Sequence, residues 1–126
     1  MFGPLGFFHK FAGKDYDDKR PRDRYVDESK RLLGVLGQRL VGLAWIMGDD
    51  YTIADIATFP WVRNLIGFYG AGELVEIDKF PHVLRALAAF VARLAVEKGL
   101  NIPRSAWSLF SKVLSLPTVW CGRPPA

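Results

Sequence analysis

The chain has 126 residues, of which 50% are hydrophobic and 24% are charged, with a formal net charge of +4. This composition excludes a disordered tail and is sufficient for one globular domain with its own core. No uncharged apolar run reaches the roughly 18 to 20 residues that a bilayer span needs, and the first residues lack a basic leader, so we expect a cytoplasmic protein without a membrane partner.

The first notable segment is KFAGKDYDDKRPRDR (residues 10–24), where six positive charges meet four aspartates. Runs of mixed sign are typical of a solvated surface, and no recognition motif accompanies the charge, so we expect no nucleic-acid binding. The two histidines lie far apart and the single cysteine, Cys121, lies in a Pro/Gly-rich tail. Because the spacings of metal ligands are absent, we expect no metal.

A first long helix is predicted from Pro21 to Leu43, with Pro21 in its first turn. Its apolar stripe recurs at steps of three and four residues, as in an amphipathic helix. The stripe comprises Tyr25, Ser29, Leu32, Leu33, Leu36, Leu40 and Leu43. Gly34 and Gly37 each cost roughly 1 kcal/mol inside a helix, so we expect tertiary packing, with another backbone close to them, to hold this helix together.

The next helix is predicted to begin after Thr52. Thr52 as N-cap and Asp55 form a capping box, in which the threonine oxygen accepts from the Asp55 amide and the carboxylate accepts from the Thr52 amide. Tyr51 before the cap is expected to pack on Ile56 as a hydrophobic staple. The helix is apolar nearly all round, which predicts a central buried helix, bent at Pro60. Its apolar residues include Ile53, Ile56, Phe59, Trp61 and Leu65.

A third helix is predicted from Phe80 to Leu94, preceded by Asp78 as N-cap. Before it, GFYGAG (67–72) has three glycines, but no strand precedes it and no Lys-Ser/Thr follows it, so we interpret it as a helix end and loop. No stretch alternates as a strand would. The predicted fold class is therefore all-α, and SAWSLFSKVLSL in the tail could add a short amphipathic helix.

The run YTIADIATFPW resembles the corresponding segment in the C-terminal helical domain of glutathione transferases. The similarity extends to five segments: GPLGFFHKFA (3–12), RDRYVDESKRLLGVLGQRL (22–40), WIMGDDYTIADIATFPW (45–61), FPHVLRA (80–86) and AVEKGLNIP (95–103). Together they are similar to the bacterial branch near the Nu class, whose members are glutathione-dependent disulfide reductases and weak transferases.

This resemblance implies a helical bundle around a central buried helix over residues 1–103, beginning partway into the first long helix of that domain. The N-terminal thioredoxin-like half of the family would be absent from this chain. Residues 104–126 do not match the ending of the family and are expected to be a divergent tail.

The resemblance also implies where glutathione would be bound. Arg24 matches the arginine that reaches the tripeptide from the helical domain, and a guanidinium can hold a glutathione carboxylate through two hydrogen bonds. The alternative for Arg24 is a solvated arginine on a basic loop. By the same resemblance, the pocket for the second, hydrophobic substrate is lined by Phe7, Phe8, His9 and Phe11. Their alternative is a role in the core or in an interface.

Two functions are compatible with these observations. In the first, the chain supplies part of the glutathione contact and an apolar wall for conjugation or disulfide reduction, and the thioredoxin-like half activates the thiol. No catalytic residue is then expected here, and the chain alone should be nearly inactive. Glutathione, a second copy of the chain or a separate thioredoxin-like half would be its partner. In the second, the chain is a non-catalytic helical interaction module.

Overall fold

The computed structural model describes residues 2–100 and 102, and no β-strand occurs among these residues. The all-α prediction is therefore confirmed. The chain divides into two units, residues 1–91 and residues 92–126, and the second includes a helical stretch at 94–100. No helix within the described part has the length and hydropathy that crossing a bilayer requires. The predicted tail at 104–126 lies outside the described residues, and the boundary at residue 103 stays a prediction.

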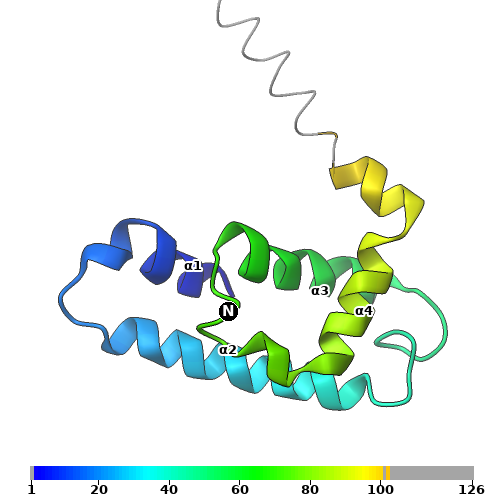
Figure 1. Cartoon of the computed structure of the whole chain (residues 1–126), viewed down its shortest axis with the longest axis horizontal. Coiled ribbons are helices and arrows are strands. Elements are labelled where there is room, and N and C mark those ends of the chain that lie inside the picture. Colours follow the sequence, from blue (N-terminus) through cyan, green and yellow to red (C-terminus); the bar gives the residue numbers. More distant parts are fainter. Residues whose placement is uncertain (1, 101, 103–126) are drawn as a thin grey trace, which may run out of the picture. The chain divides into compact units, whose positions relative to one another are not determined.

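The first unit contains four α-helices and three short helical turns (Figure 1). The α-helices are α1 (Phe2–Lys10), α2 (Arg20–Arg39), α3 (Ile53–Arg63) and α4 (Pro81–Val91). The short turns are η1 (Ala12–Asp15), the π-helical turn η2 (Asn64–Phe68) and η3 (Ile77–Lys79). Helix α2 packs against both α1 and α4, and α4 also packs against α3.

The apolar core of this unit is contributed by all four α-helices and by the loop before η3. Its fully or almost fully buried side chains are Leu5, Val26, Leu33, Leu40, Phe59, Val62, Leu65, Ala71, Val75, Ile77, Val83, Ala86 and Phe90. Of the predicted stripe, Ser29, Leu33 and Leu40 are buried, whereas Tyr25, Leu32, Leu36 and Leu43 are only partly buried. Val26 and Gly37, which lay outside the predicted stripe, complete the buried face of α2. Burial of this one face is what holds α2 in the fold.

Helix α2 ends at Arg39, four residues before the predicted end at Leu43. Leu40 is its C-cap, and the chain turns at Gly42, whose φ of 70° suits glycine. Arg85 of α4 donates to the carbonyls of Leu40 and Leu43, at 3.2 and 2.5 Å. These carbonyls are therefore satisfied by a side chain from another helix, which no local pattern in the sequence reveals.

The two glycines inside α2 face side chains of α4 and its preceding residue. A Cβ added at Gly34 would lie 3.8 Å from the Phe80 ring, and one at Gly37 would lie 3.7 Å from Val83. Both distances are ordinary van der Waals contacts. The prediction that another backbone approaches these glycines is therefore wrong, because ring and methyl groups occupy that space.

The capping box at the start of α3 is present. The Asp55 carboxylate accepts from the Thr52 amide at 2.9 Å, and Thr52 Oγ1 accepts from the Ala54 amide at 3.3 Å. The Asp55 amide, which we expected to donate to that oxygen, donates to the Thr52 carbonyl at 3.1 Å. Asp55 is fully buried and also accepts from the Ile46 amide at 3.0 Å, so it joins the preceding loop to the helix.

Helix α3 is buried on one face only. Phe59 and Val62 are fully buried, whereas Ile53, Ile56 and Trp61 are 82%, 52% and 50% exposed. The prediction of a helix enclosed on all sides, with Trp61 in the core, is therefore wrong within this unit. Ala57, Thr58 and Trp61 of α3 border an open hollow that residues of α1 and α2 also line.

Tyr51 lies in an aromatic cluster between the loop, α3 and α4. Its ring centroid lies 5.0 Å from that of Trp45 and 6.4 Å from that of Phe90, and Phe59 lies 5.6 Å from Phe90. Ile56 is 52% exposed, and its staple contact with Tyr51 stays a prediction. The cluster brings the ring of Tyr51 against Phe90 of α4, which lies far from it in the sequence.

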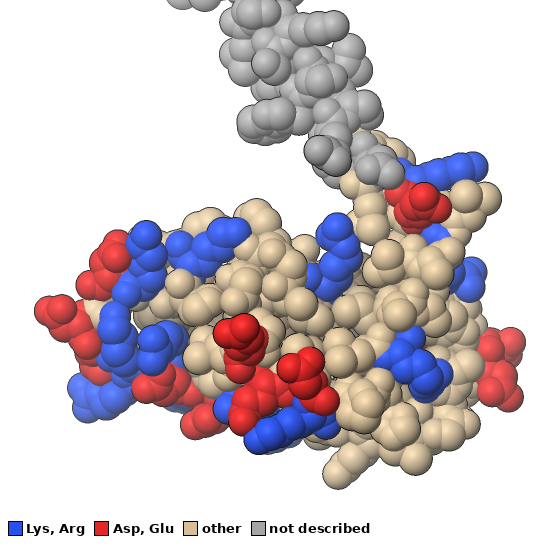
Figure 2. All heavy atoms as spheres, viewed as in Figure 1, with Lys and Arg blue, Asp and Glu red and all other residues tan. Residues whose placement is uncertain are grey.

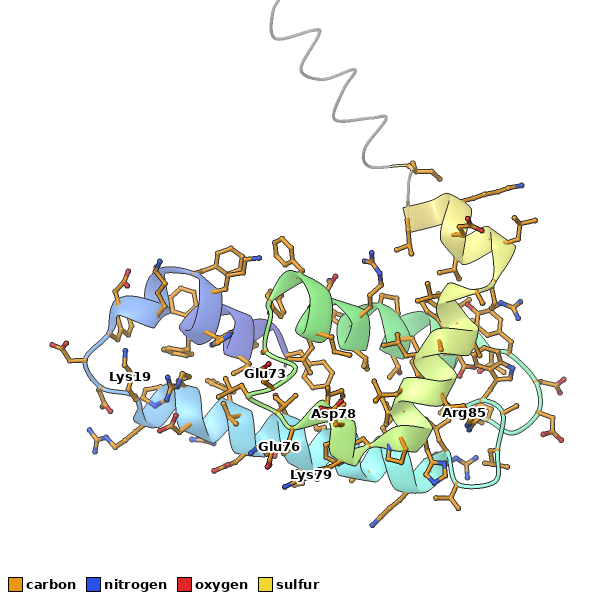
Figure 3. All side chains as sticks on the ribbon, in the orientation of Figure 1. Lys19, Glu73, Glu76, Asp78, Lys79 and Arg85 are labelled. Atoms are coloured by element: carbon orange, nitrogen blue, oxygen red, sulfur yellow. The ribbon has the colours of Figure 1, made fainter. Side chains whose placement is uncertain are left out.

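A left-handed residue closes the turn before η3. Glu76 has φ of 54°, and its carboxylate accepts from Lys30 of α2 at 2.8 Å and from Lys79 at 2.6 Å. Figure 3 labels Glu76 and Lys79 in this turn. The hydrogen bonds from Lys30 and Lys79, with the charges of both ammonium groups, lower the pKa of Glu76 to about 2. The carboxylate thus links this turn to α2.

Candidate functional site

Arg24 lies in the second turn of α2 with its side chain exposed. It borders two open surface hollows of about 780 and 430 Å³. The larger is lined by Arg20, Asp23, Arg24, Tyr25, Asp27, Glu28 and Arg31, and the smaller by Phe8, Asp18, Arg20, Pro21, Arg24 and Tyr25. Arg20, Arg24 and Tyr25 therefore line both hollows.

The arginines around Arg24 are already paired. Arg20 donates to both carboxylate oxygens of Asp18, at 2.8 to 3.1 Å. Arg31 forms a fork with Glu28 at 2.7 and 2.8 Å. The hydrogen bonds from Arg20 lower the pKa of Asp18, and the bond from Arg31 is the main cause that lowers the pKa of Glu28. These carboxylates therefore stay ionised and committed to their arginines.

Arg24 makes no hydrogen bond or ion pair with any residue in the described part of the chain. Figure 2 shows the interleaved positive and negative side chains at this end of α2. The charge of Arg24 contributes to the lowered pKa of Glu28, but the carboxylates of Asp18 and Glu28 are hydrogen-bonded to Arg20 and Arg31. The guanidinium of Arg24 can therefore form hydrogen bonds with a carboxylate from outside. A charge-assisted fork is the contact that such a group forms best.

The aromatic segment of α1 reaches this site through one residue. The Phe8 ring stacks on Tyr25 at 5.7 Å with an angle of 17° between the planes, and Phe8 lines the smaller hollow with Arg24. Phe7 packs edge-on against Phe8 at 5.1 Å, and both rings contact Tyr16. A Cβ at Gly13 would lie 2.8 Å from the Phe8 ring, so glycine permits the chain to pass there.

The aromatic rings among the four predicted pocket residues fall into two groups, and their role as a pocket wall stays a prediction. Phe11 packs instead with Phe68 and Tyr69, at centroid distances of 6.1 and 6.3 Å. His9 is partly buried and makes no hydrogen bond with a described residue. The structure thus brings Phe8 to Arg24, packs Phe7 on Phe8, and places Phe11 in a second aromatic group.

Sequence reasoning missed Tyr25 and Tyr16 as partners of the aromatic segment, and Phe68 and Tyr69 as partners of Phe11. The adjacency of Tyr25 to Arg24 was a usable signal. A second usable signal was the pair of aromatic residues between glycines in GFYGAG, because aromatic rings in a loop need a surface to pack on. Among the described residues, no three His, Cys, Asp or Glu side chains gather as a metal site requires.

Comparison with known proteins identifies relatives of the whole helical region. Residues 21–96 match the family model described as glutathione S-transferase, C-terminal domain. A crystal structure of a glutathione transferase from Burkholderia graminis, with two glutathione molecules bound per subunit, is 78% identical with a TM-score of 0.78 over 81% of this chain and 42% of that one. One from Pseudomonas putida, with one glutathione disulfide bound per subunit, is 62% identical with a TM-score of 0.78 over 81% and 44%.

The disulfide-bond oxidoreductase YghU of Escherichia coli is 38% identical over 105 residues, which are 82% of this chain and 36% of that protein. The chain therefore spans less than half the length of each of these three proteins. The matched family model covers more than half of the chain, in the helical region that carries Arg24. The chain belongs to the glutathione S-transferase family, and residues 21–96 match its C-terminal domain.

Proposed function

We propose that this chain supplies the helical-domain part of a glutathione site, for glutathione conjugation or glutathione-dependent disulfide reduction. The similarity to proteins that bind glutathione or its disulfide supports this proposal. The single observation that carries it is the unpaired guanidinium of Arg24, beside an aromatic floor of Phe8 and Tyr25. Glutathione has two carboxylates, so one can form a fork with Arg24.

In this proposal the chain binds and orients glutathione and does not activate its sulfur. Arg24 holds a carboxylate, while Phe7, Phe8, His9 and Phe11 contribute to the wall for the second substrate. Stabilisation of the thiolate requires preorganised donors near the sulfur, and we assign these to a thioredoxin-like half, either joined to this chain or separate. The chain would act in the cytoplasm, alone or as a homodimer.

Calorimetric titration with reduced and oxidised glutathione tests the proposal, on the purified chain and on the chain joined to a thioredoxin-like half. Arg24→Ala should weaken the affinity of the joined form by about 1.5 to 3 kcal/mol, the range for a hydrogen bond to a charged group. Arg63→Ala is the matched control, because Arg63 is exposed on α3 and also makes no ion pair with a described residue. Equal affinities of the parent and Arg24→Ala would remove Arg24 from the site.

A non-catalytic interaction module is the second candidate, favoured by the exposed apolar residues of α3. Ile53, Ile56 and Trp61 are each at least half exposed, and Trp61 also lines a hollow of about 370 Å³ with residues of α1 and α2. Such a surface is typical of protein contacts. Failure of the joined form to bind either form of glutathione, with its helical content intact, would favour this candidate.

A further inference from the structure

A second aromatic group lies apart from Arg24 and consists of Phe11, Phe68 and Tyr69, with Lys10 beside it. We call these four residues the aromatic patch. Phe11 and Phe68 are 46% and 53% exposed, and their ring planes are inclined at 47°. Two large apolar rings therefore remain in water next to each other, which costs free energy unless something covers them.

The backbone holds Phe68 outward. The chain leaves α3 through the π-helical turn η2, in which the Tyr69 amide donates to the Asn64 carbonyl at 2.8 Å. Gly70 then adopts φ of 67°, and the Ala71 amide donates to the Leu65 carbonyl at 3.0 Å. This closure is a glycine-ended helix terminus, and π-helical turns are frequent at functional sites.

The neighbouring tyrosine locks that turn against α1. The Tyr69 ring occupies the space beside Gly6 so closely that an added Cβ would lie 2.5 Å from it. Tyr69 thereby fills the inner position of the turn, and Phe68 is left on the outer one. The exposure of Phe68 follows from this packing.

Lys10 adds a positive charge to the patch. Its ammonium lies 4.0 Å from the centroid of the Phe68 ring, and it also donates to the Phe68 carbonyl. The ammonium can donate three hydrogen bonds, so beside its bond to the Phe68 carbonyl it can still pair with an anion that approaches it next to the Phe68 ring. No carboxylate forms an ion pair with Lys10 among the described residues.

We propose that the aromatic patch binds a flat apolar group that carries an anionic substituent, with Phe68 as the residue that determines this specificity. The apolar body would pack on Phe11 and on the face of Phe68 opposite the Lys10 ammonium, and the anion would pair with Lys10. This inference rests on the proposed function and deepens it: the second substrate belongs to the class of aromatic acids. Phe68 thereby joins Phe11 in the wall for that substrate.

Two fluorescent probes that differ in one charge test the inference on the full chain. Anilinonaphthalene sulfonate is flat and anionic, and phenylnaphthylamine is its neutral counterpart. The parent should bind the sulfonate more tightly than the neutral probe. Phe68→Ala should weaken both by about tenfold, because the stacking surface is lost. Phe68→Leu, which keeps an apolar side chain without a flat ring, should bind both probes with affinities between those of the parent and of Phe68→Ala.

Substitutions at Lys10 separate the charge from the rings. Lys10→Met should weaken the binding of the sulfonate probe alone, by about three- to fivefold, whereas Lys10→Arg should keep the preference for the anionic probe. Trp61→Ala is the matched control, since Trp61 is an equally exposed ring outside the patch. Unchanged binding by Phe68→Ala, loss of binding by Trp61→Ala, or a parent without preference for the sulfonate would overturn the inference.

Glutathione titration of the same proteins separates this inference from the proposed function. Phe68→Ala should keep whatever glutathione affinity the parent has, and Arg24→Ala should keep the binding of both probes. A joined form that binds the probes as expected but not glutathione would refute the proposed function and retain the patch. A joined form that binds glutathione but shows none of the probe effects would refute the patch alone.

Discussion

Replacement of Asp55 by alanine is the sharpest test of how the start of α3 is held. The Asp55 carboxylate is fully buried and accepts three hydrogen bonds, from the amides of Thr52 and Ile46 and from the hydroxyl of Thr52, at 2.9 to 3.2 Å. Alanine removes every one of these acceptors. Two backbone amides in a partly buried position would then lack their partner.

The size of the effect follows from those contacts. A buried group left without a partner costs about 1 to 3 kcal/mol, and a lost helix cap costs about 1 kcal/mol. Because the bonds share one carboxylate and water can reach part of this region, their costs do not add fully. We expect Asp55→Ala to lower the free energy of unfolding by about 2 to 4 kcal/mol. Thr52→Ala should cost about 1 kcal/mol, because the bond between Asp55 and Ile46 remains.

Urea denaturation followed by circular dichroism measures these differences. Asp49→Ala is the matched control, because Asp49 is an exposed aspartate of the same loop and its loss should change the free energy by less than about 0.5 kcal/mol. The reasoning would be refuted if Asp55→Ala and Asp49→Ala had equal midpoints at equal slopes, or if Thr52→Ala cost more than Asp55→Ala.

Two further predictions concern the turn before η3 and the glycines. The pKa of Glu76 is lowered from 4.5 to about 2, so the stability that its carboxylate adds should be fully present above pH 4.5 and be lost as the pH falls through about 2. The difference in unfolding free energy between the parent and Glu76→Gln should therefore shrink as the pH falls over that range. A difference that stays constant would contradict the ion pairs. Gly34→Ala should stabilise the chain by about 0.5 to 1 kcal/mol in thermal unfolding, since its Cβ has room, whereas Gly6→Ala should destabilise it by about 1 to 3 kcal/mol through the clash with Tyr69. Equal melting temperatures for the two alanine variants would show that the distances at these glycines do not control packing.

The candidate site was predictable where its parts are adjacent in sequence or match a known motif. The motif containing Arg24 and the aromatic run from Phe7 to Phe11 both stood out as segments. The contacts of these segments could not be predicted, because Phe8 packs on Tyr25 of another helix and Phe11 packs on Phe68, which lies 57 residues away in the sequence. The absence of a hydrogen-bonded carboxylate at Arg24 also becomes visible only when the partners of the surrounding arginines are known.

The sequence by itself determined the all-α class, the buried positions Ser29, Leu33 and Leu40 of α2 and the capping box at Thr52, since each follows from a local pattern in the chain. Tertiary structure brings Arg85 of α4 to the carbonyl of Leu40, the C-cap of α2, and to that of Leu43 beyond the helix. It also decided which residues of the apolar helix α3 are buried and where Asp55 finds its partner in the loop. Helical periodicity shows which residues share a face, but burial depends on whether another element covers that face, and that contact forms between segments far apart in the chain.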